Sequence, residues 1–161
     1  MLNIPFSPPD ITESEINEVC EALRSGWITT GPRTKEFERR IAAFCGTEKT
    51  ACLNSATAAL ELNLRVLGIG EGDEVIVPAY TYTASASAAL HTGAKVVFVD
   101  CRPDSFEADY EQLEAAINEK TKAIIPVDLA GIICDYDKIF AAVENKKHLF
   151  NPANKIQSAM G

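Results

Sequence analysis

The 161-residue sequence has no long apolar run and a deficit of positive charge. No stretch approaches the ~20 consecutive apolar residues that a membrane span needs. The first ten residues carry no basic segment of the kind that begins a secretory signal, so we expect a cytoplasmic protein. Only 15 Lys and Arg stand against 23 Asp and Glu, and the formal charge of -8 repels nucleic acid and anionic membranes. Neither is expected as a partner.

The sequence also lacks the residue spacing of a disulfide framework or a metal site. Its five cysteines are odd in number and widely spaced, without a C-x-x-C pair. We therefore expect small, mostly buried thiols. Neither His91 nor His148 has an Asp, Glu or Cys at helical metal-ligand spacing, so each is expected on the surface or at a helix end. No metal site is predicted.

What the sequence does contain is an alternation of short Val- and Ile-rich runs with amphipathic segments of about ten residues. This alternation predicts an α/β fold, with a mostly parallel sheet covered by helices on both faces. Strands are expected at residues 50–53, 74–77, 95–99 and 122–127. Helices are expected at residues 12–25, 32–46, 56–67, 83–92 and 109–119, and from 135 onward.

Two of these helices have apolar positions that predict a buried face. In the helix that starts at Pro32 these are Phe37, Ile41 and Phe44, and in the helix that starts at Asp135 they are Ile139, Phe140 and Val143. The last stretch, residues 145–161, is polar and supplies no further strand. Because a buried parallel sheet would then keep an unpaired edge, we expect these residues to be the first part of a larger domain.

The most informative segment is the small-residue turn Asn54-Ser55-Ala56-Thr57, between an expected strand and an expected helix. The first N–H groups of a helix lack intrahelical partners and lie at the positive end of its dipole, so such a junction binds anions. The turn has neither a Lys nor the glycine spacing of a P-loop or dinucleotide fingerprint, which favours a single phosphate monoester such as pyridoxal phosphate. The alternative is an ordinary helix cap, for which Ser and Thr are common.

Ligands of open α/β sheets collect at the carboxyl ends of the strands. After the second expected strand come Tyr80 and Tyr82, which either stack on a flat ring or lie at the edge of the core. Asp128 follows the fourth strand and either lines the same crevice or belongs to a simple loop. The loop 26–32 contains the only Trp, Trp27, which is either a packing anchor or part of a ligand-contact loop.

Taken in order, several motifs resemble the DegT/DnrJ/EryC1/StrS family of sugar aminotransferases. They are G-W-I-T-T-G-P, N-S-A-T-A-A-L, G-x-G-x-G-D-E-V-I-V-P-A-Y-T-Y, G-A-K-V-V-F-V-D and T-K-A-I-I-P-V-D-L-A-G. The resemblance runs from about Pro5 to Gly131. It implies the large domain of the aspartate-aminotransferase fold type and pyridoxal 5'-phosphate as cofactor. It also implies a homodimer whose substrates are a nucleotide-linked keto sugar and an amino donor, typically glutamate, in amino-sugar or surface-polysaccharide biosynthesis.

The resemblance also implies roles for individual residues. The amides of Ala56 and Thr57 and the Thr57 hydroxyl would hold the cofactor phosphate, Ser55 would shape the turn, and Tyr82 would stack on the pyridine ring. The residues that would approach the sugar are Trp27, Thr29, Thr30 and Gly31. Asp128 stands where the commoner family pattern has His, a departure that bears on the substrate rather than on the cofactor.

By the same resemblance, the Schiff-base lysine and the carboxylate beside the pyridine nitrogen are expected beyond Gly161. The expected organisation is N-terminal helices and substrate loop in 1–49, βα units in 50–134, and a helix with an irregular tail in 135–161, without the C-terminal domain. The chain alone is predicted to be inactive. A sugar dehydratase of the same family and a short, non-catalytic binding or dimerisation module remain alternatives. A nicotinamide-binding domain is disfavoured because G-x-G-x-x-G does not follow the first strand.

Overall fold

The computed structural model describes residues 5 and 7–159. These divide between Cys52 and Leu53 into two compact units, unit 1 before the division and unit 2 after it. Unit 1 contains helices α1 (Glu13–Arg24) and α2 (Pro32–Cys45). Helix α1 begins with a complete capping box, in which the Thr12 hydroxyl accepts a backbone N–H and the Glu15 carboxylate accepts the Thr12 N–H at 2.6 Å. Helix α2 begins at Pro32 and ends at Gly46 in the left-handed conformation, as the sequence indicates.

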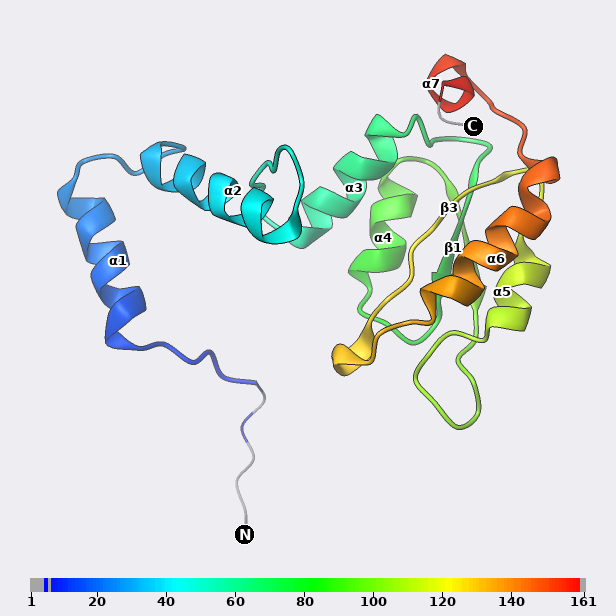
Figure 1. Cartoon of the computed structure of the whole chain (residues 1–161), viewed down its shortest axis with the longest axis horizontal. Helices are drawn as coiled ribbons and strands as arrows, with labels where there is room; N and C mark the ends of the chain where they lie inside the picture. The colour runs from blue at the N-terminus through cyan, green and yellow to red at the C-terminus, as the bar shows by residue number, and fades with distance from the viewer. Residues whose placement is uncertain (1–4, 6, 160–161) are drawn as a thin grey trace, which may run out of the picture. The chain divides into compact units, whose positions relative to one another are not determined.

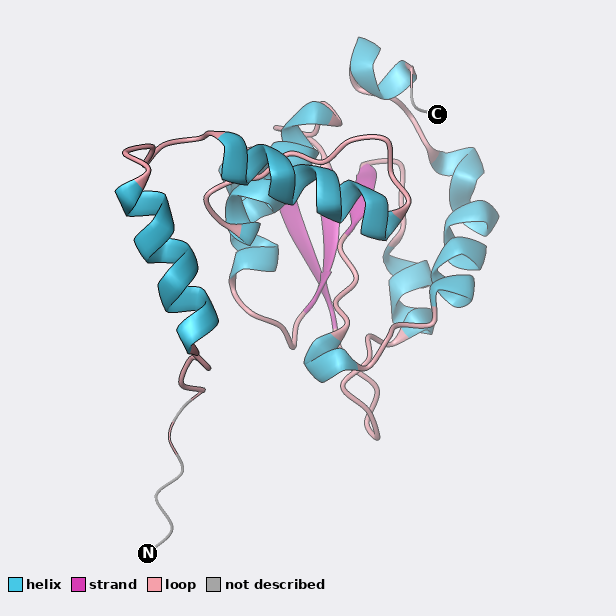
Figure 2. Ribbon diagram, turned by 60° about the vertical axis from the view of Figure 1, so that its left-hand side comes forward, coloured by secondary structure: helices cyan, strands magenta, loops and turns pink. Residues whose placement is uncertain are grey.

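Unit 2 is an α/β layer structure around a three-stranded parallel sheet. Its strands are β1 (Glu74–Pro78), β2 (Lys95–Val99) and β3 (Thr121–Ile124), in the order β2-β1-β3. The helices are α3 (Ala56–Val66), α4 (Ala84–His91), α5 (Tyr110–Ala116), α6 (Tyr136–Lys146) and α7 (Lys155–Ser158), with 3-10 turns at Leu129–Gly131 and Lys147–Leu149. Figures 1 and 2 show the strands between the two helical layers.

The alternation of side chains along the central strand explains the two layers. Val75 and Val77 pack with Leu64 of α3 and with two alanines of α4 on one face. Ile76 points the other way and packs with Leu113 of α5 and Ala142 of α6. All five residues of β1 are buried, as expected for the centre of a parallel sheet. The predicted fold class, with helices on both faces, is confirmed.

Three expectations for strands and helices need correction. Residues 50–53 form no strand, because they make no ladder contact with a described strand and the Cys52 N–H donates instead to the Glu38 carboxylate at 2.9 Å. Strand β3 ends at Ile124 rather than 127: the Ile125 N–H still donates to the Ile76 carbonyl, but Pro126 has no N–H to continue the ladder. Helix α5 ends at Ala116 because Ile117 is extended.

The expected buried faces are also partly wrong. Phe37 and Phe44 of α2 are exposed, and so are Phe140 and Val143 of α6, while Ile139 is buried as predicted. Among the described residues nothing covers these positions, so helical periodicity identified apolar faces without identifying what they pack against. Of the five cysteines only Cys134 is buried, which corrects the expectation of mostly buried thiols.

The tail is more ordered than expected. Helix α7 packs back against unit 2 through Gln157, which is only 2% exposed. Its amide nitrogen donates to the Gly68 carbonyl at 3.0 Å and to the Asp73 carboxylate at 2.8 Å. The last two residues of the predicted tail lie outside those described. In the described part of the chain no helix combines the length and apolarity needed to cross a bilayer.

Candidate functional site

The turn before α3 has the geometry of an anion site. Ser55 is the N-cap of this 11-residue helix, and its Oγ accepts the Ala58 N–H at 3.1 Å. The Ala59 N–H donates to the Ser55 carbonyl, which is the first backbone bond of the helix. Between them, the Ala56 and Thr57 N–H groups have no acceptor within the described residues. Two amides at the positive end of a helix dipole are thus available to a phosphate.

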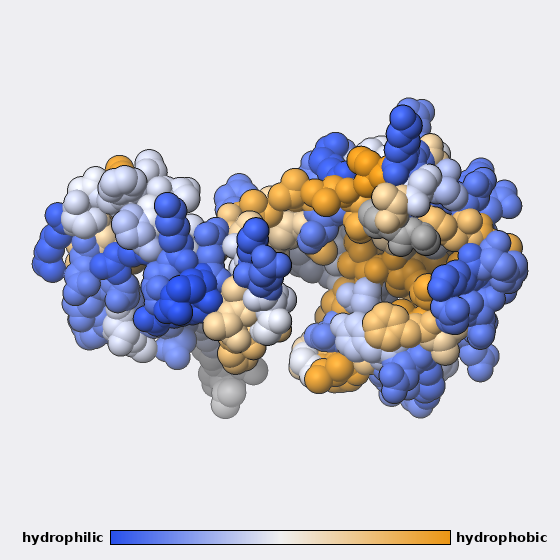
Figure 3. All heavy atoms as spheres, turned by 45° about the horizontal axis from the view of Figure 1, so that its top comes forward, coloured by the Kyte–Doolittle hydropathy of each residue, from blue (hydrophilic) through white to orange (hydrophobic). Residues whose placement is uncertain are grey.

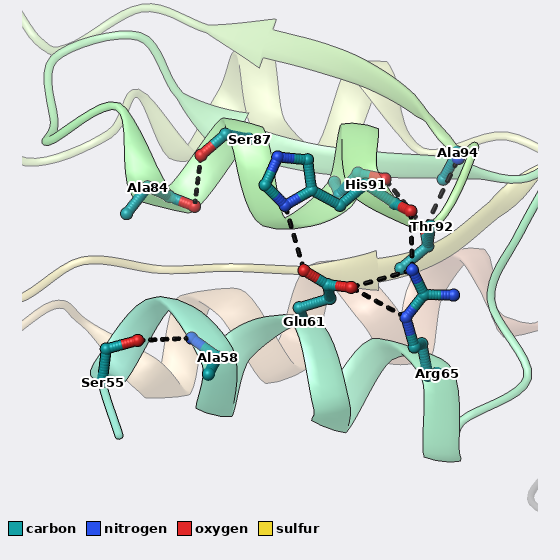
Figure 4. A network of polar contacts seen from close by, with 10 residues as sticks. Ser55, Ala58, Glu61, Arg65, Ala84, Ser87, His91, Thr92 and Ala94 are labelled. Carbon is teal, nitrogen blue, oxygen red and sulfur yellow. Dashed lines mark hydrogen bonds and ion pairs between the residues drawn. The ribbon is translucent and has the colours of Figure 1, made fainter. Parts of the chain in front are cut away.

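The start of α4 lies beside the start of α3. The two helices pack on the same face of the sheet, and the close view in Figure 4 places Ser55 and Ala84 at the same end of the pair. Tyr82, two residues before α4, is 81% exposed. Tyr80 instead stacks on Phe106, with ring centroids 5.4 Å apart and planes 19° from parallel. Of the two tyrosines that the sequence left open, Tyr82 is therefore the one whose ring faces remain available.

A polar clamp at the other end of these helices fixes how they lie (Figure 4). Glu61 of α3 accepts Arg65 Nε at 2.9 Å and contacts His91 Nδ1 of α4 at 3.0 Å. Arg65 also donates to the His91 carbonyl at 2.8 Å. The hydrogen bond from Arg65, and then that from His91, lowers the pKa of Glu61 and keeps it ionised. His91 thus has the helix-end role predicted for it, and the clamp holds α3 and α4 in register.

Asp128 follows β3 but its carboxylate is bound by its own loop. Asp128 Oδ1 accepts the Cys134 N–H at 2.9 Å, and the Tyr136 hydroxyl lies 3.3 Å from both carboxylate oxygens. The Cys134 backbone hydrogen bond is the main cause that lowers the pKa of Asp128. Cys134 and Tyr136 were not identified from the sequence, because no local pattern marks a carboxylate that closes a loop six residues later.

A cavity of about 800 Å³ opens at the ends of β1 and β2. Its lining includes the stacked Tyr80 and Phe106 together with Asp100, Arg102 and Ile132. Cys101 pairs with Ala108 in an isolated bridge that closes the intervening loop. Because its lining comes from segments that are distant in sequence, this cavity is a feature of the tertiary structure.

The predicted substrate loop belongs to unit 1. Its Trp27 Nε1 donates to the Thr30 carbonyl at 3.0 Å, and Gly31 is buried beneath the indole. Thr29 and Thr30 are exposed, and within the described residues their hydroxyls make no hydrogen bond. Trp27 is therefore a local anchor and also remains more than half exposed.

Nothing in the described part of the chain gathers three or more His, Cys, Asp or Glu side chains as metal ligands would be gathered. The turn before α3 and the start of α4 instead offer backbone amides, hydroxyls and an exposed aromatic ring. This donor set suits a phosphate-bearing organic cofactor.

Comparison with known proteins adds to this geometry. Residues 9–150 match the model of the DegT/DnrJ/EryC1/StrS aminotransferase family. The spore coat polysaccharide biosynthesis protein SpsC of Bacillus subtilis is 44% identical over 142 residues, covering 88% of this chain and 36% of that protein. The UDP-4-amino-4-deoxy-L-arabinose–oxoglutarate aminotransferase of Shewanella sediminis is also 44% identical, covering 89% of this chain and 37% of that protein.

Solved structures agree. A Streptococcus pneumoniae protein assigned to the sugar aminotransferases is 65% identical, with a TM-score of 0.92 over 98% of this chain and 40% of its own, in both PLP and PMP forms. A GDP-4-keto-6-deoxymannose-3-dehydratase is 27% identical, with a TM-score of 0.80 over 88% of this chain and 38% of its own.

The chain therefore spans between a third and two fifths of the length of the relatives it matches. Within that span it has the fold of its solved relatives. The family and its solved members are pyridoxal-phosphate enzymes. The chain belongs to the DegT/DnrJ/EryC1/StrS aminotransferase family.

Proposed function

We propose that this chain is the N-terminal part of the cofactor-binding domain of a sugar aminotransferase. The complete protein would transfer an amino group, typically from glutamate, to a nucleotide-linked keto sugar in the synthesis of amino sugars or surface polysaccharides. The observation that carries the proposal is the pair of free amides at Ala56 and Thr57 on a helix that the Ser55 hydroxyl caps.

In this proposal the chain binds and orients the cofactor. The Ala56 and Thr57 amides, with the Thr57 hydroxyl, would hold its phosphate, and Ser55 would keep the turn in shape. The exposed Tyr82 ring, at the adjacent helix start, would stack on the pyridine ring. Bound pyridoxal phosphate supplies an electron sink for the bonds around the amino group. The Glu61–His91 clamp would keep the phosphate turn and the stacking residue at a constant separation.

The loop 27–31 would approach the sugar, with the exposed Thr29 and Thr30 hydroxyls as its contact groups and with Trp27 and Gly31 giving the loop its shape. For Asp128 we favour the loop role over the crevice role, the two that its sequence position leaves open. Because its carboxylate is engaged by Cys134 and Tyr136, it would shape the loop 128–136 beside the crevice rather than reach a ligand itself. The amino-donor site, and the homodimer that the family resemblance implies, are part of the same proposal.

The decisive test is to sequence the source DNA past the codon for Gly161. A continuing frame with a strand-end Asp and then a Lys would support the aminotransferase. A His in place of that Lys would favour the dehydratase alternative, which the solved dehydratase with a similar fold keeps open. An immediate stop codon would overturn the catalytic proposal in favour of a binding or dimerisation module.

A second test uses the 161-residue chain alone. With a keto-sugar nucleotide and glutamate it is expected to release no 2-oxoglutarate, because the reactive lysine is expected elsewhere. Pyridoxal phosphate should bind more tightly than pyridoxal, and Thr57→Val should weaken the binding of the phosphorylated form only. Turnover by the chain alone, or equal affinity for the two compounds, would contradict the proposal.

A further inference from the structure

The loop between α1 and α2 is closed by its single tryptophan. Gly26 leaves α1 with a left-handed φ of 72°, and the Trp27 N–H then donates to the Ser25 hydroxyl at 3.2 Å. The side chain of Trp27 makes a second bond, in which the indole Nε1 donates to the Thr30 carbonyl at 3.0 Å. The indole therefore spans the loop and ties its first residue to its last.

Gly31 completes this closure for a steric reason. Its φ of -159° lies outside the left-handed region, so the backbone conformation does not itself call for glycine. Glycine is required for steric reasons instead, because a Cβ at residue 31 would overlap Nε1, Cδ1 and Cε2 of the Trp27 indole. Gly31 is buried while Trp27 stays 58% exposed, which means that the ring is seated on the glycine and open on its other side. We call this pair the Trp27–Gly31 interlock.

The two ends of the loop are held as well. Arg33, in the first turn of α2, forms ion pairs with Glu18 and with Glu21 of α1, the latter at 3.0 Å. Between these fixed ends Thr29 and Thr30 are exposed, with hydroxyls that make no hydrogen bond within the described residues. A short loop that is tied internally and presents two free hydroxyls already has much of the order that a binding loop must otherwise acquire on binding.

We propose that the Trp27–Gly31 interlock is the positioning element of the substrate loop, holding the Thr29 and Thr30 hydroxyls where the hydroxyl-rich substrate meets them. Trp27 and Gly31 act through the loop, and the hydroxyls make the contact. This assignment rests on the proposed function for the identity of the ligand, but the interlock itself is a property of this chain. Because the interlock orders the loop before the substrate arrives, less conformational entropy is lost on binding, which favours substrate binding.

The first test follows the indole in the 161-residue chain. Trp27 is the only tryptophan, so time-resolved fluorescence anisotropy reports on this ring alone. In Gly31→Ala the new methyl group should unseat the indole, and the amplitude of the nanosecond and faster decay should rise at least about twofold. Thr29→Ala, in the same loop but outside the interlock, is the matched control and should leave the decay unchanged. Equal decays in Gly31→Ala and wild type, at equal helix content by circular dichroism, would overturn the interlock.

A second variant protects the test against a folding artefact. Trp27→Phe keeps a ring over Gly31 but removes the indole N–H that the Thr30 carbonyl accepts, so the backbone NMR order parameters of residues 28–31 should fall to below about 0.6 while those of α1 and α2 are unchanged. Unchanged order parameters in the loop would show that the indole hydrogen bond does not order it.

The link to the substrate is tested in the complete enzyme. Gly31→Ala should raise KM for the keto sugar about tenfold while KM for the amino donor stays within about twofold. Equal rises in both constants would assign the interlock a purely structural role and overturn the proposal. Absence of aminotransferase activity in the wild type would instead refute the proposed function, leaving the anisotropy result intact.

Discussion

At the scale of single residues, Ser55 has two consequences that can be separated. Its hydroxyl caps α3, and by doing so it leaves the Ala56 and Thr57 amides as the groups open to an anion. A residue that only capped the helix would affect stability alone. One that only bound ligand would affect affinity alone.

We predict that Ser55→Ala lowers the free energy of unfolding by about 1 kcal/mol, the usual cost of a lost N-cap. Ser55→Asp should restore the cap, yet weaken pyridoxal phosphate binding, because its carboxylate lies beside the amides that the phosphate needs. Urea unfolding measures the first effect and equilibrium dialysis the second. Full-strength binding by Ser55→Asp would show that the phosphate does not use this turn.

The buried carboxylate of Glu74 makes stability depend on pH. Glu74 is 7% exposed and accepts Asn118 Nδ2 and Lys95 Nζ, each at 2.8 Å. These bonds, Asn118 first, lower the pKa of Glu74 below that of the unfolded chain. The unfolded state therefore takes up the proton more readily, so this contribution is complete above about pH 4.3 and is lost as the pH falls toward the folded pKa.

Accordingly, the free energy of unfolding should fall more steeply between about pH 5 and pH 3 in the wild type than in Glu74→Gln, as measured by urea titration at each pH. Glu71→Gln removes the same charge from an exposed position of the preceding turn and is the control. If Glu74→Gln and Glu71→Gln show the same pH dependence, the buried network does not contribute.

At the scale of elements, helix α7 is held mainly by the side chain of Gln157. Gln157 uses its amide nitrogen on Gly68 and Asp73, and its oxygen accepts the Ala153 N–H at 2.7 Å. Asn154 reinforces the same contact by donating to the Gly68 carbonyl at 2.7 Å. The tail is thereby attached to the loop that leads from α3 into β1.

Gln157→Ala should cost about 1–3 kcal/mol of unfolding free energy, because it removes the hydrogen bonds to the Gly68 carbonyl and to the buried Asp73 carboxylate. Lys155→Ala, exposed at the first position of the same short helix, should change stability by less than about 0.5 kcal/mol. Thermal or urea unfolding distinguishes them. Equal stabilities of the two variants would mean that α7 does not dock in solution.

At the scale of the whole molecule, apolar side chains remain at the surface of both units (Figure 3). In unit 2 a groove of about 410 Å³ runs between β3 and α6, and its lining includes Ile124, Phe140, Val143 and Phe150. The groove is far more apolar than an ordinary solvent-facing surface, which makes it a binding surface for any small apolar probe.

We expect the folded chain to bind an anilinonaphthalene sulfonate dye, and Phe140→Asp to reduce the fluorescence of the bound dye by about half. Ile28→Ser removes an apolar residue of unit 1 that is even more exposed than Phe140, and it should leave this signal unchanged. Near-ultraviolet circular dichroism checks that the variants stay native, since a loosened core would also bind the dye. A dye signal insensitive to Phe140→Asp would place the binding elsewhere.

Sequence patterns spanning a few residues predicted several helices, the central strand and the family of this protein. The capping box at Thr12, Pro32 at the start of α2 and the Val- and Ile-rich run of β1 each fix an element through interactions a few residues apart. The order of the motifs identifies the family, and the small and hydroxyl residues around Ser55 are enough to indicate an anion site. The predicted helix starts and the central strand are confirmed because helix caps and strand alternation depend on neighbours in sequence, whereas the anion site stays a prediction.

Only the tertiary structure decided which strands pair, which apolar faces are buried and which aromatic rings are free, because these features depend on contacts between segments distant in sequence. Residues 50–53 have strand-like composition but no described strand beside them, so they remain irregular. Phe37 and Phe140 lie on amphipathic helices, yet nothing in the described part of the chain covers them. Tyr80 and Tyr82 look equivalent in sequence until Phe106, brought in from a distant loop, engages one ring and leaves the other free. Periodicity states which face is apolar, whereas packing between distant segments determines which face is buried.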